Sequence, residues 1–231
     1  NKKLKYFNKY KLDNCIETKY ADVSLIHAHN ILFKKAYNDG CYKIISLSQA
    51  CIPLKTFNYI YNFLTKDNLS HFNVIPNQEG VFPRCKNALK YYNKNDIQKS
   101  SNWFILNRNV AKIVCFNNSI KQINKIWKDI ISPEEHYFIT EIFKNKLNSE
   151  IITTPNLASG ATTFTNWNNM NYQYKSNSTP KNYNYITIDE INYLINQPCL
   201  FGRKFNPDCK VTGLPLIKKT SLENYFYCKI Y

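Results

Sequence analysis

Residues 21–64 alternate between helical and strand patterns, and this restricts the fold more than any other stretch. Apolar side chains recur at helical spacing over 21–37, a turn follows at 38–40, and 41–48 form an apolar run that ends in small polar residues. Pro53 ends the strand and opens a loop, and a second helical pattern covers 57–64. This succession is typical of an α/β fold, in which ligands bind at the carboxyl ends of the strands.

The remaining chain continues the same pattern. We expect strands at 102–106, 151–154 and 162–165, and helices at 107–114, 117–130 and 187–195. We therefore predict a single α/β domain over residues 1–231, with a mixed sheet flanked by helices. Residues 66–100 have the composition of a basic loop excursion, which suits a lid, an acceptor contact or an inert insertion, and 207–231 form a C-terminal extension.

Residues 132–138 predict a helix start with unusual chemistry. Ser132 is a suitable N-cap, Pro133 suits the first helical position, and Glu134 and Glu135 complement the positive end of the helix dipole. The helix should run to about residue 146. The local pattern allows two interpretations: a well-capped surface helix, or a rigid first turn that presents a general base.

Charge and cysteine usage limit the function classes. A formal charge of +15 favours anionic partners such as nucleic acid, anionic membranes, nucleotide phosphates or acidic glycans. The basic residues are scattered, without an arginine-rich helix or an RNA-binding sheet motif, which argues against specific recognition of nucleic acid. Eight cysteines occur without a CxxC pair or zinc spacing, so they suit either disulfides or buried thiols, and we predict no metal site.

No apolar run is long enough to span a bilayer. The first residue is Asn1 rather than Met, and we expect a leader, a membrane anchor or a first structural unit upstream of it.

Four segments, in this order, resemble the core-2/I-branching glycosyltransferase family, which comprises β-1,6-N-acetylglucosaminyltransferases and their xylosyltransferase relatives. They are SLSQACIPL at 46–54, SNWFILNR at 101–108, SPEEHYFIT at 132–140 and LFGRKF at 200–205. The resemblance implies a GT-A-like, Rossmann-like fold that lacks the metal-binding DxD tripeptide, and this sequence contains no DxD. It also implies a secretory or Golgi membrane location and no metal cofactor.

The resemblance assigns roles to the carboxylates and to one basic pair. Inverting transfer needs a carboxylate that takes the proton of the acceptor hydroxyl, and by family position this base is Glu135. Glu134 is then a helix-capping or supporting carboxylate, and His136 is a supporting residue. Without a metal, fixed cations must stabilise the leaving nucleoside diphosphate, and family position gives this role to Lys204 with Arg203 beside it.

Three further positions follow from the same comparison. Trp167 resembles an aromatic residue that stacks on the acceptor sugar, although a core tryptophan at a strand end explains it equally well. Lys175 or Lys181 could supply a second cation for the diphosphate. We interpret Cys51 as structural.

One departure from the family leaves the function open. The family begins with a strand and a short His/Asp segment that holds the nucleoside, and neither is found before Lys19, so the first strand of the fold could be missing. We expect a glycosyltransferase that uses a UDP-sugar, with UDP-N-acetylglucosamine as donor and a glycan or glycoprotein as acceptor. A non-catalytic glycan-binding or structural relative is the alternative, and a basic nucleic-acid binder is a third hypothesis that rests on charge alone.

Overall fold

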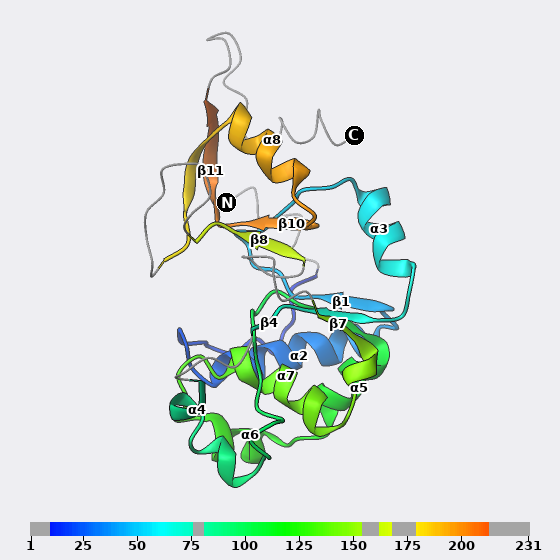
Figure 1. Cartoon of the computed structure of the whole chain (residues 1–231), viewed down its shortest axis with the longest axis vertical. Coiled ribbons are helices and arrows are strands. Elements are labelled where there is room, and N and C mark those ends of the chain that lie inside the picture. Colours follow the sequence, from blue (N-terminus) through cyan, green and yellow to red (C-terminus); the bar gives the residue numbers. More distant parts are fainter. Residues whose placement is uncertain (1–9, 76–80, 154–161, 168–178, 213–231) are drawn as a thin grey trace.

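A four-stranded mixed sheet in the order β1-β6-β3-β7 lies in the middle of the computed structural model (Figure 1). The structure describes residues 10–75, 81–153, 162–167 and 179–212. The strands of this sheet are β1 (Lys43–Ile45), β6 (Ile105–Asn107), β3 (Ser70–Phe72) and β7 (Ile151–Thr153). β6 is antiparallel to β1 and β3, whereas β3 and β7 are parallel. The predicted α/β class is confirmed.

Three helices cover one face of this sheet. They are α2 (Ser24–Asn38), α5 (Arg108–Phe116) and α7 (Glu134–Lys144), and α6 (Ile120–Trp127) lies beyond them (Figure 1). The Phe104 ring lies 5.8 Å from that of Phe33 and 5.3 Å from that of Phe138, between ring centroids. Trp127 of α6 is fully buried against Tyr137 of α7. Each helix thus contributes an apolar stripe to one continuous core.

The opposite face of the sheet is covered by α3 (Phe57–Thr65) and by the segment that contains β10 (Phe201–Arg203). Leu64, Ile105, Leu200 and Phe201 form a separate buried cluster there. Because both faces are covered, all three residues of β6 are buried, which accounts for the continuous apolar run in its sequence.

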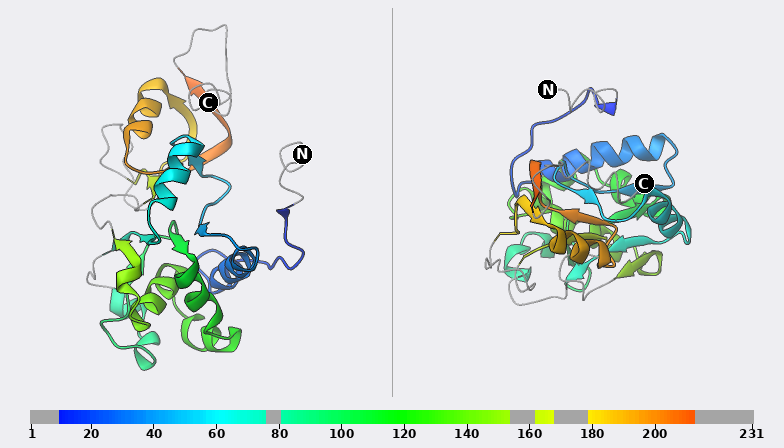
Figure 2. Two further views of the ribbon diagram at one scale, coloured as in Figure 1. Left: turned by 90° about the vertical axis from the view of Figure 1, so that its right-hand side faces the viewer. Right: turned by 90° about the horizontal axis from the view of Figure 1, so that it is seen from above.

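The predicted mixed sheet flanked by helices is confirmed, and the other strands form three smaller sheets rather than extensions of it. They are β2 (Ile52–Pro53) with β10 and β8 (Thr163–Thr165), β9 (Tyr183–Thr187) with β11 (Phe205–Thr212), and β4 (Val74–Ile75) with β5 (Lys99–Ser100). Figure 2 shows β11 and α8 (Ile188–Asn196) on the side of the main sheet away from α2, α5 and α7.

Two predicted boundaries need correction. Residues 66–100 are not a loop throughout, because they contain the interior strand β3 together with β4, α4 (Val81–Arg84), the 3-10 turn Ala88–Lys90 and β5. The predicted C-terminal extension at 207–231 starts inside β11, which pairs in parallel with β9. Residues 213–231 lie outside the described part of the chain.

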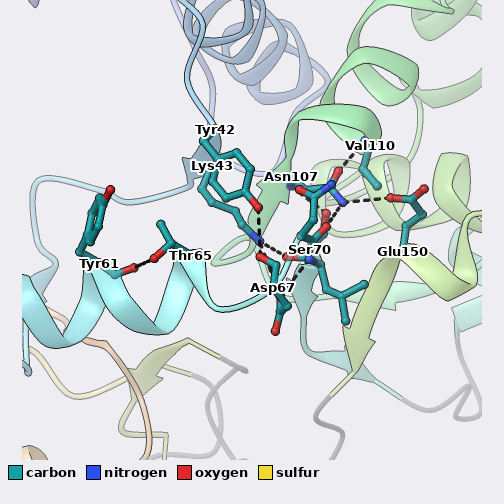
Figure 3. Close-up of polar contacts among 11 residues, drawn as sticks. Tyr42, Lys43, Tyr61, Thr65, Asp67, Ser70, Asn107, Val110 and Glu150 are labelled. Carbon is teal, nitrogen blue, oxygen red and sulfur yellow. Dashed lines mark hydrogen bonds and ion pairs between the residues drawn. The ribbon is translucent and has the colours of Figure 1, made fainter.

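A polar network joins the strands of the main sheet at one of their ends (Figure 3). The Asn107 side chain accepts a hydrogen bond from Val110 N at 2.7 Å and donates to Asn68 O and to Glu150 Oε2. Lys43 Nζ lies 3.8 Å from a carboxylate oxygen of Asp67. Because Lys43 pairs with Asn107 and Ile45 with Ile105, this network lies at the opposite end of the strands from Ser46, which follows β1.

Seven of the eight cysteines fall within the described residues, and none of these seven forms a disulfide bond. Cys228 lies outside them. Within the described ranges, no helix is both long enough and apolar enough to cross a bilayer.

Candidate active site

The turn before α7 differs from the predicted cap. Ser132 has a φ of +51°, and its carbonyl oxygen, rather than its side chain, accepts a hydrogen bond from Glu135 N at 3.1 Å. The N-cap position is Pro133, without a side-chain cap, and the helix ends at Lys144. The Ser132 amide donates to Ala21 O at 3.0 Å. The first turn of α7 is therefore fixed by backbone contacts with the segment that leads into α2.

Glu135 lies in this first turn between two cations. Its Oε2 atom is 3.7 Å from Arg84 Nη1 and 3.5 Å from Lys99 Nζ, and its side chain is 29% exposed. Glu135 is thus a carboxylate that remains open to solvent and is held by ion pairs from α4 and β5. Sequence reasoning missed both pairs. Both cations belong to the basic stretch at 66–100. The many basic residues of that stretch were the available signal in the sequence for cations near the site.

The neighbours of Glu135 turn inward instead. Glu134 is 4% exposed and accepts a hydrogen bond at Oε1 from Asn102 Nδ2 at 3.1 Å, so it supports the turn rather than capping it. Burial raises the pKa of the Glu134 carboxyl. His136 is fully buried, its Nδ1 lies 2.8 Å from Gln98 O, and burial lowers its pKa to about 4. Both side chains pack against the segment 98–102.

In the second predicted group, Arg203 is the last residue of β10 and Lys204 lies between β10 and β11. The Arg203 guanidinium carbon is 4.1 Å from the centre of the Trp103 ring, a cation–π arrangement. Burial lowers the pKa of Arg203, and a hydrogen bond with the Cys51 thiol partly offsets this. Lys204 is half-buried, and its carbonyl accepts a hydrogen bond from Tyr183 N at 2.8 Å. The peptide bond between Arg203 and Lys204 is cis.

The structure brings the four motif segments into contact with one another. The side-chain contacts are Asn102 with Glu134 and Trp103 with Arg203. The backbone hydrogen bonds are Leu54 N to Leu200 O at 2.8 Å, Phe205 N to Ala50 O at 2.9 Å and Ser46 N to Phe104 O at 3.0 Å. No hydrogen bond or ion pair joins Glu135 with Lys204 within the described residues. Their two turns are linked instead through the adjacent residues Asn102 and Trp103.

The structure also places three of the four other residues singled out in the sequence, which are Trp167, Lys181 and Cys51. Trp167 follows β8 and is 44% exposed, so the core alternative for this side chain is wrong. Lys181 forms an ion pair with Glu190 at the start of α8. Lys175 lies outside the described residues. Cys51 lies beside Ser48, whose amide nitrogen is 3.4 Å from the Cys51 sulfur.

A pocket of about 380 Å³ lies elsewhere, between α2 and α6. Its lining contains apolar side chains together with polar ones such as His27, Asn30 and Asn124, and Lys34 is the one charged residue in it. None of the predicted site residues lines this pocket. A site for a nucleoside diphosphate and a base needs cations together with a carboxylate, and we therefore place the candidate site at the motif segments.

The described ranges contain no group of three or more His, Cys, Asp or Glu side chains placed to hold a metal ion.

Comparison with known proteins agrees with the sequence resemblance. Residues 2–195 match the family model described as Core-2/I-Branching enzyme. The chain is also similar to the protein named glycosyltransferase BC10 of Oryza sativa subsp. japonica, with 22% identity over 172 residues. That match covers 63% of this chain and 42% of the length of the rice protein.

Proposed function

The chain belongs to the core-2/I-branching enzyme family, and from this premise we propose that it is an inverting glycosyltransferase. In this proposal it moves a sugar, N-acetylglucosamine, from a UDP-sugar to a hydroxyl group of a glycan or glycoprotein. It works without a bound metal. This last point is supported by the missing DxD tripeptide in the sequence.

The proposed chemistry is one in-line displacement at the anomeric carbon of the donor sugar. Glu135 accepts the proton of the acceptor hydroxyl as the new bond forms. Its ion pairs with Arg84 and Lys99 fix the carboxylate in place, and its partial exposure leaves it accessible to an acceptor. Lys204 and Arg203 stabilise the charge that grows on the departing diphosphate.

The main support for the proposal is one observation. The turn with Glu135 and the turn with Lys204 contact two consecutive residues, Asn102 and Trp103. Asn102 binds Glu134, and Trp103 carries the Arg203 guanidinium on its ring. A base and a leaving-group cation that act on one substrate must be held in fixed relation to each other. The exposed ring of Trp167, after the neighbouring strand β8, is available to stack on an acceptor sugar.

The activity is tested by measuring UDP release from UDP-N-acetylglucosamine with a panel of glycan acceptors in the presence of a chelator. We expect turnover in the wild type. We expect Glu135→Gln to lower kcat by roughly 10²- to 10⁴-fold, the usual contribution of a general base, with UDP affinity unchanged. The matched control is Glu17→Gln, which changes an exposed glutamate and should keep full activity.

Calorimetry with UDP separates the enzyme from a non-catalytic relative. Lys204→Met should weaken UDP binding by about tenfold or more, because a charge-assisted contact contributes roughly 1.5–3 kcal/mol. Full activity of Glu135→Gln would show that Glu135 is not the general base. Clean binding of UDP by the wild type would count against a non-catalytic glycan-binding or structural relative, and the absence of UDP binding would favour it.

A further inference from the structure

A buried seam lies directly behind Glu135, between the segment 98–102 and the start of α7. Three contacts define it. Gln98 O lies 2.8 Å from His136 Nδ1, Gln98 N donates to Thr140 Oγ1 at 3.2 Å, and Asn102 Nδ2 donates to Glu134 Oε1 at 3.1 Å. The two segments therefore run side by side over the first two turns of the helix.

The seam contains an unusual number of polar atoms without a protein partner. Among the described residues, Glu134 Oε2, His136 Nε2, Asn102 Oδ1 and the hydroxyls of Ser100 and Ser101 are all buried and have no hydrogen-bond partner. Glu134, His136 and Ser100 are each at least nine-tenths buried as whole residues. Native proteins pair nearly all such atoms with protein groups or with buried water.

The roles of these atoms can be worked out from their partners. A carbonyl oxygen only accepts, so His136 Nδ1 carries a hydrogen towards Gln98 O, and Nε2 of the neutral ring is an acceptor. Asn102 donates from Nδ2, which leaves Oδ1 as a second acceptor. If Glu134 were ionised, Oε2 would be a third acceptor, and the two serine hydroxyls would be the only donors among these five unpaired atoms.

We propose that Glu134 is protonated in the working enzyme and acts as a neutral positioning residue for the turn that carries Glu135. Asn102 occupies Oε1, so the proton is on Oε2. Residues two apart on a helix do not face each other, so the O–H group reaches His136 Nε2 through a bridging water molecule. The positioning role rests on the proposed function of Glu135, whereas the protonation state does not.

The charged groups around the seam give the neighbouring carboxyls of Glu134 and Glu135 different electrostatic surroundings. Burial is the largest cause and raises the pKa of Glu134, and the adjacent Glu135 charge also raises it. A hydrogen bond from the backbone amide of Glu134 itself, the Asn102 hydrogen bond and the Arg84 charge lower it. Lys99 and Arg84 both pair with Glu135 rather than with Glu134. His136 is neutral and adds no charge. Glu135 therefore has two ion pairs and contact with solvent, whereas Glu134 is buried and has no ion pair among the described residues, an arrangement that gives adjacent acids different roles.

Infrared spectroscopy tests the protonation state without any need for turnover. At pH 7 the folded wild type should show the carbonyl band of a protonated carboxylic acid. Glu134→Gln, which keeps the shape and supplies an amide donor, should fold and lack that band, and Glu17→Gln should retain it. A wild type without the band, a Glu134→Gln protein that keeps it, or a Glu134→Gln protein that fails to fold would each overturn the proposal.

The pH dependence of kcat tests the positioning role. Glu134→Ala removes the support of the turn and should lower kcat by up to about 10²-fold. Glu134→Gln exchanges a neutral acid for a neutral amide, so it should keep kcat within about threefold of the wild type and leave the acid limb of the profile in place. Glu135→Gln lowers kcat by roughly 10²- to 10⁴-fold. If Glu134 were charged, its removal would take a negative neighbour away from Glu135 and move the acid limb to lower pH. That displacement would refute the positioning role. If no acceptor supports turnover, the infrared result still decides the protonation state.

Discussion

Glu134 and Glu135 are adjacent in sequence but have opposite surroundings. Glu135 projects to a partly open position between Arg84 and Lys99, whereas Glu134 turns into the seam behind it. The sequence alone identified this pair and its helix, because the motif resemblance and the first-turn carboxylates coincide there. It could not show which partners each carboxyl has, because Arg84 and Lys99 are separated from Glu135 by 30 or more positions.

His136 gives a prediction for acid stability. Its pKa is lowered from 6.5 to about 4 in the folded protein, so the unfolded chain takes up a proton first as the pH falls. The stability that depends on the neutral ring is complete above pH 6.5 and is lost between about 6.5 and 4, by up to roughly 3 kcal/mol. His136→Asn should therefore lose less Tm over this interval than the wild type.

The control for this experiment is His27→Asn. His27 of α2 is partly exposed and hydrogen-bonds Asn124 of α6, so His27→Asn is the same replacement at a histidine outside the seam. Equal slopes for the wild type and His136→Asn would show that His136 does not cause the acid sensitivity.

Among the elements, helices and apolar strands were predictable and short polar strands were not. α3, α5 and α8 begin within one residue of their predicted starts, because Thr56, Asn107 and Thr187 act as caps. β3 and β9 were missed, because Ser70–Phe72 and Tyr183–Thr187 carry polar residues and are too short to show alternation. Their pairing depends on tertiary contacts that local sequence does not contain.

Asn107 is the clearest test at the element scale. Its side chain caps α5 and also donates hydrogen bonds to Asn68 and Glu150 at one end of the strands of the main sheet (Figure 3). Asn107→Ala should lower the free energy of unfolding by about 2–4 kcal/mol, because it removes a cap and leaves buried polar groups without partners. Denaturant titration measures this change.

UDP affinity should be unaltered in folded Asn107→Ala. Asn107 is part of the second motif segment, but it lies at the far end of β6 from Asn102 and Trp103, the residues that contact the turns of Glu135 and Lys204. Asn206→Ala changes an exposed side chain of β11 and should leave stability nearly unchanged. A stability loss below about 0.5 kcal/mol for Asn107→Ala, the range of ordinary surface changes, would contradict the structural role of this network.

At the scale of the whole molecule, the candidate site lies where the two halves of the fold meet. The helical half with α2, α5 and α7 supplies Glu135, and the half with β10, β11 and α8 supplies Lys204 (Figures 1 and 2). The order of the motifs along the chain was visible in the sequence. Their convergence was not, because it depends on β10 pairing with β2 and β8 across more than 145 and about 38 positions respectively.

A crystal structure of the protein with bound UDP tests the central claim most directly. The account predicts that the diphosphate contacts Lys204 and Arg203, and that the space beyond it, where the donor sugar would lie, is bordered by Glu135. UDP bound in the pocket between α2 and α6, or on any surface remote from these two turns, would contradict the account.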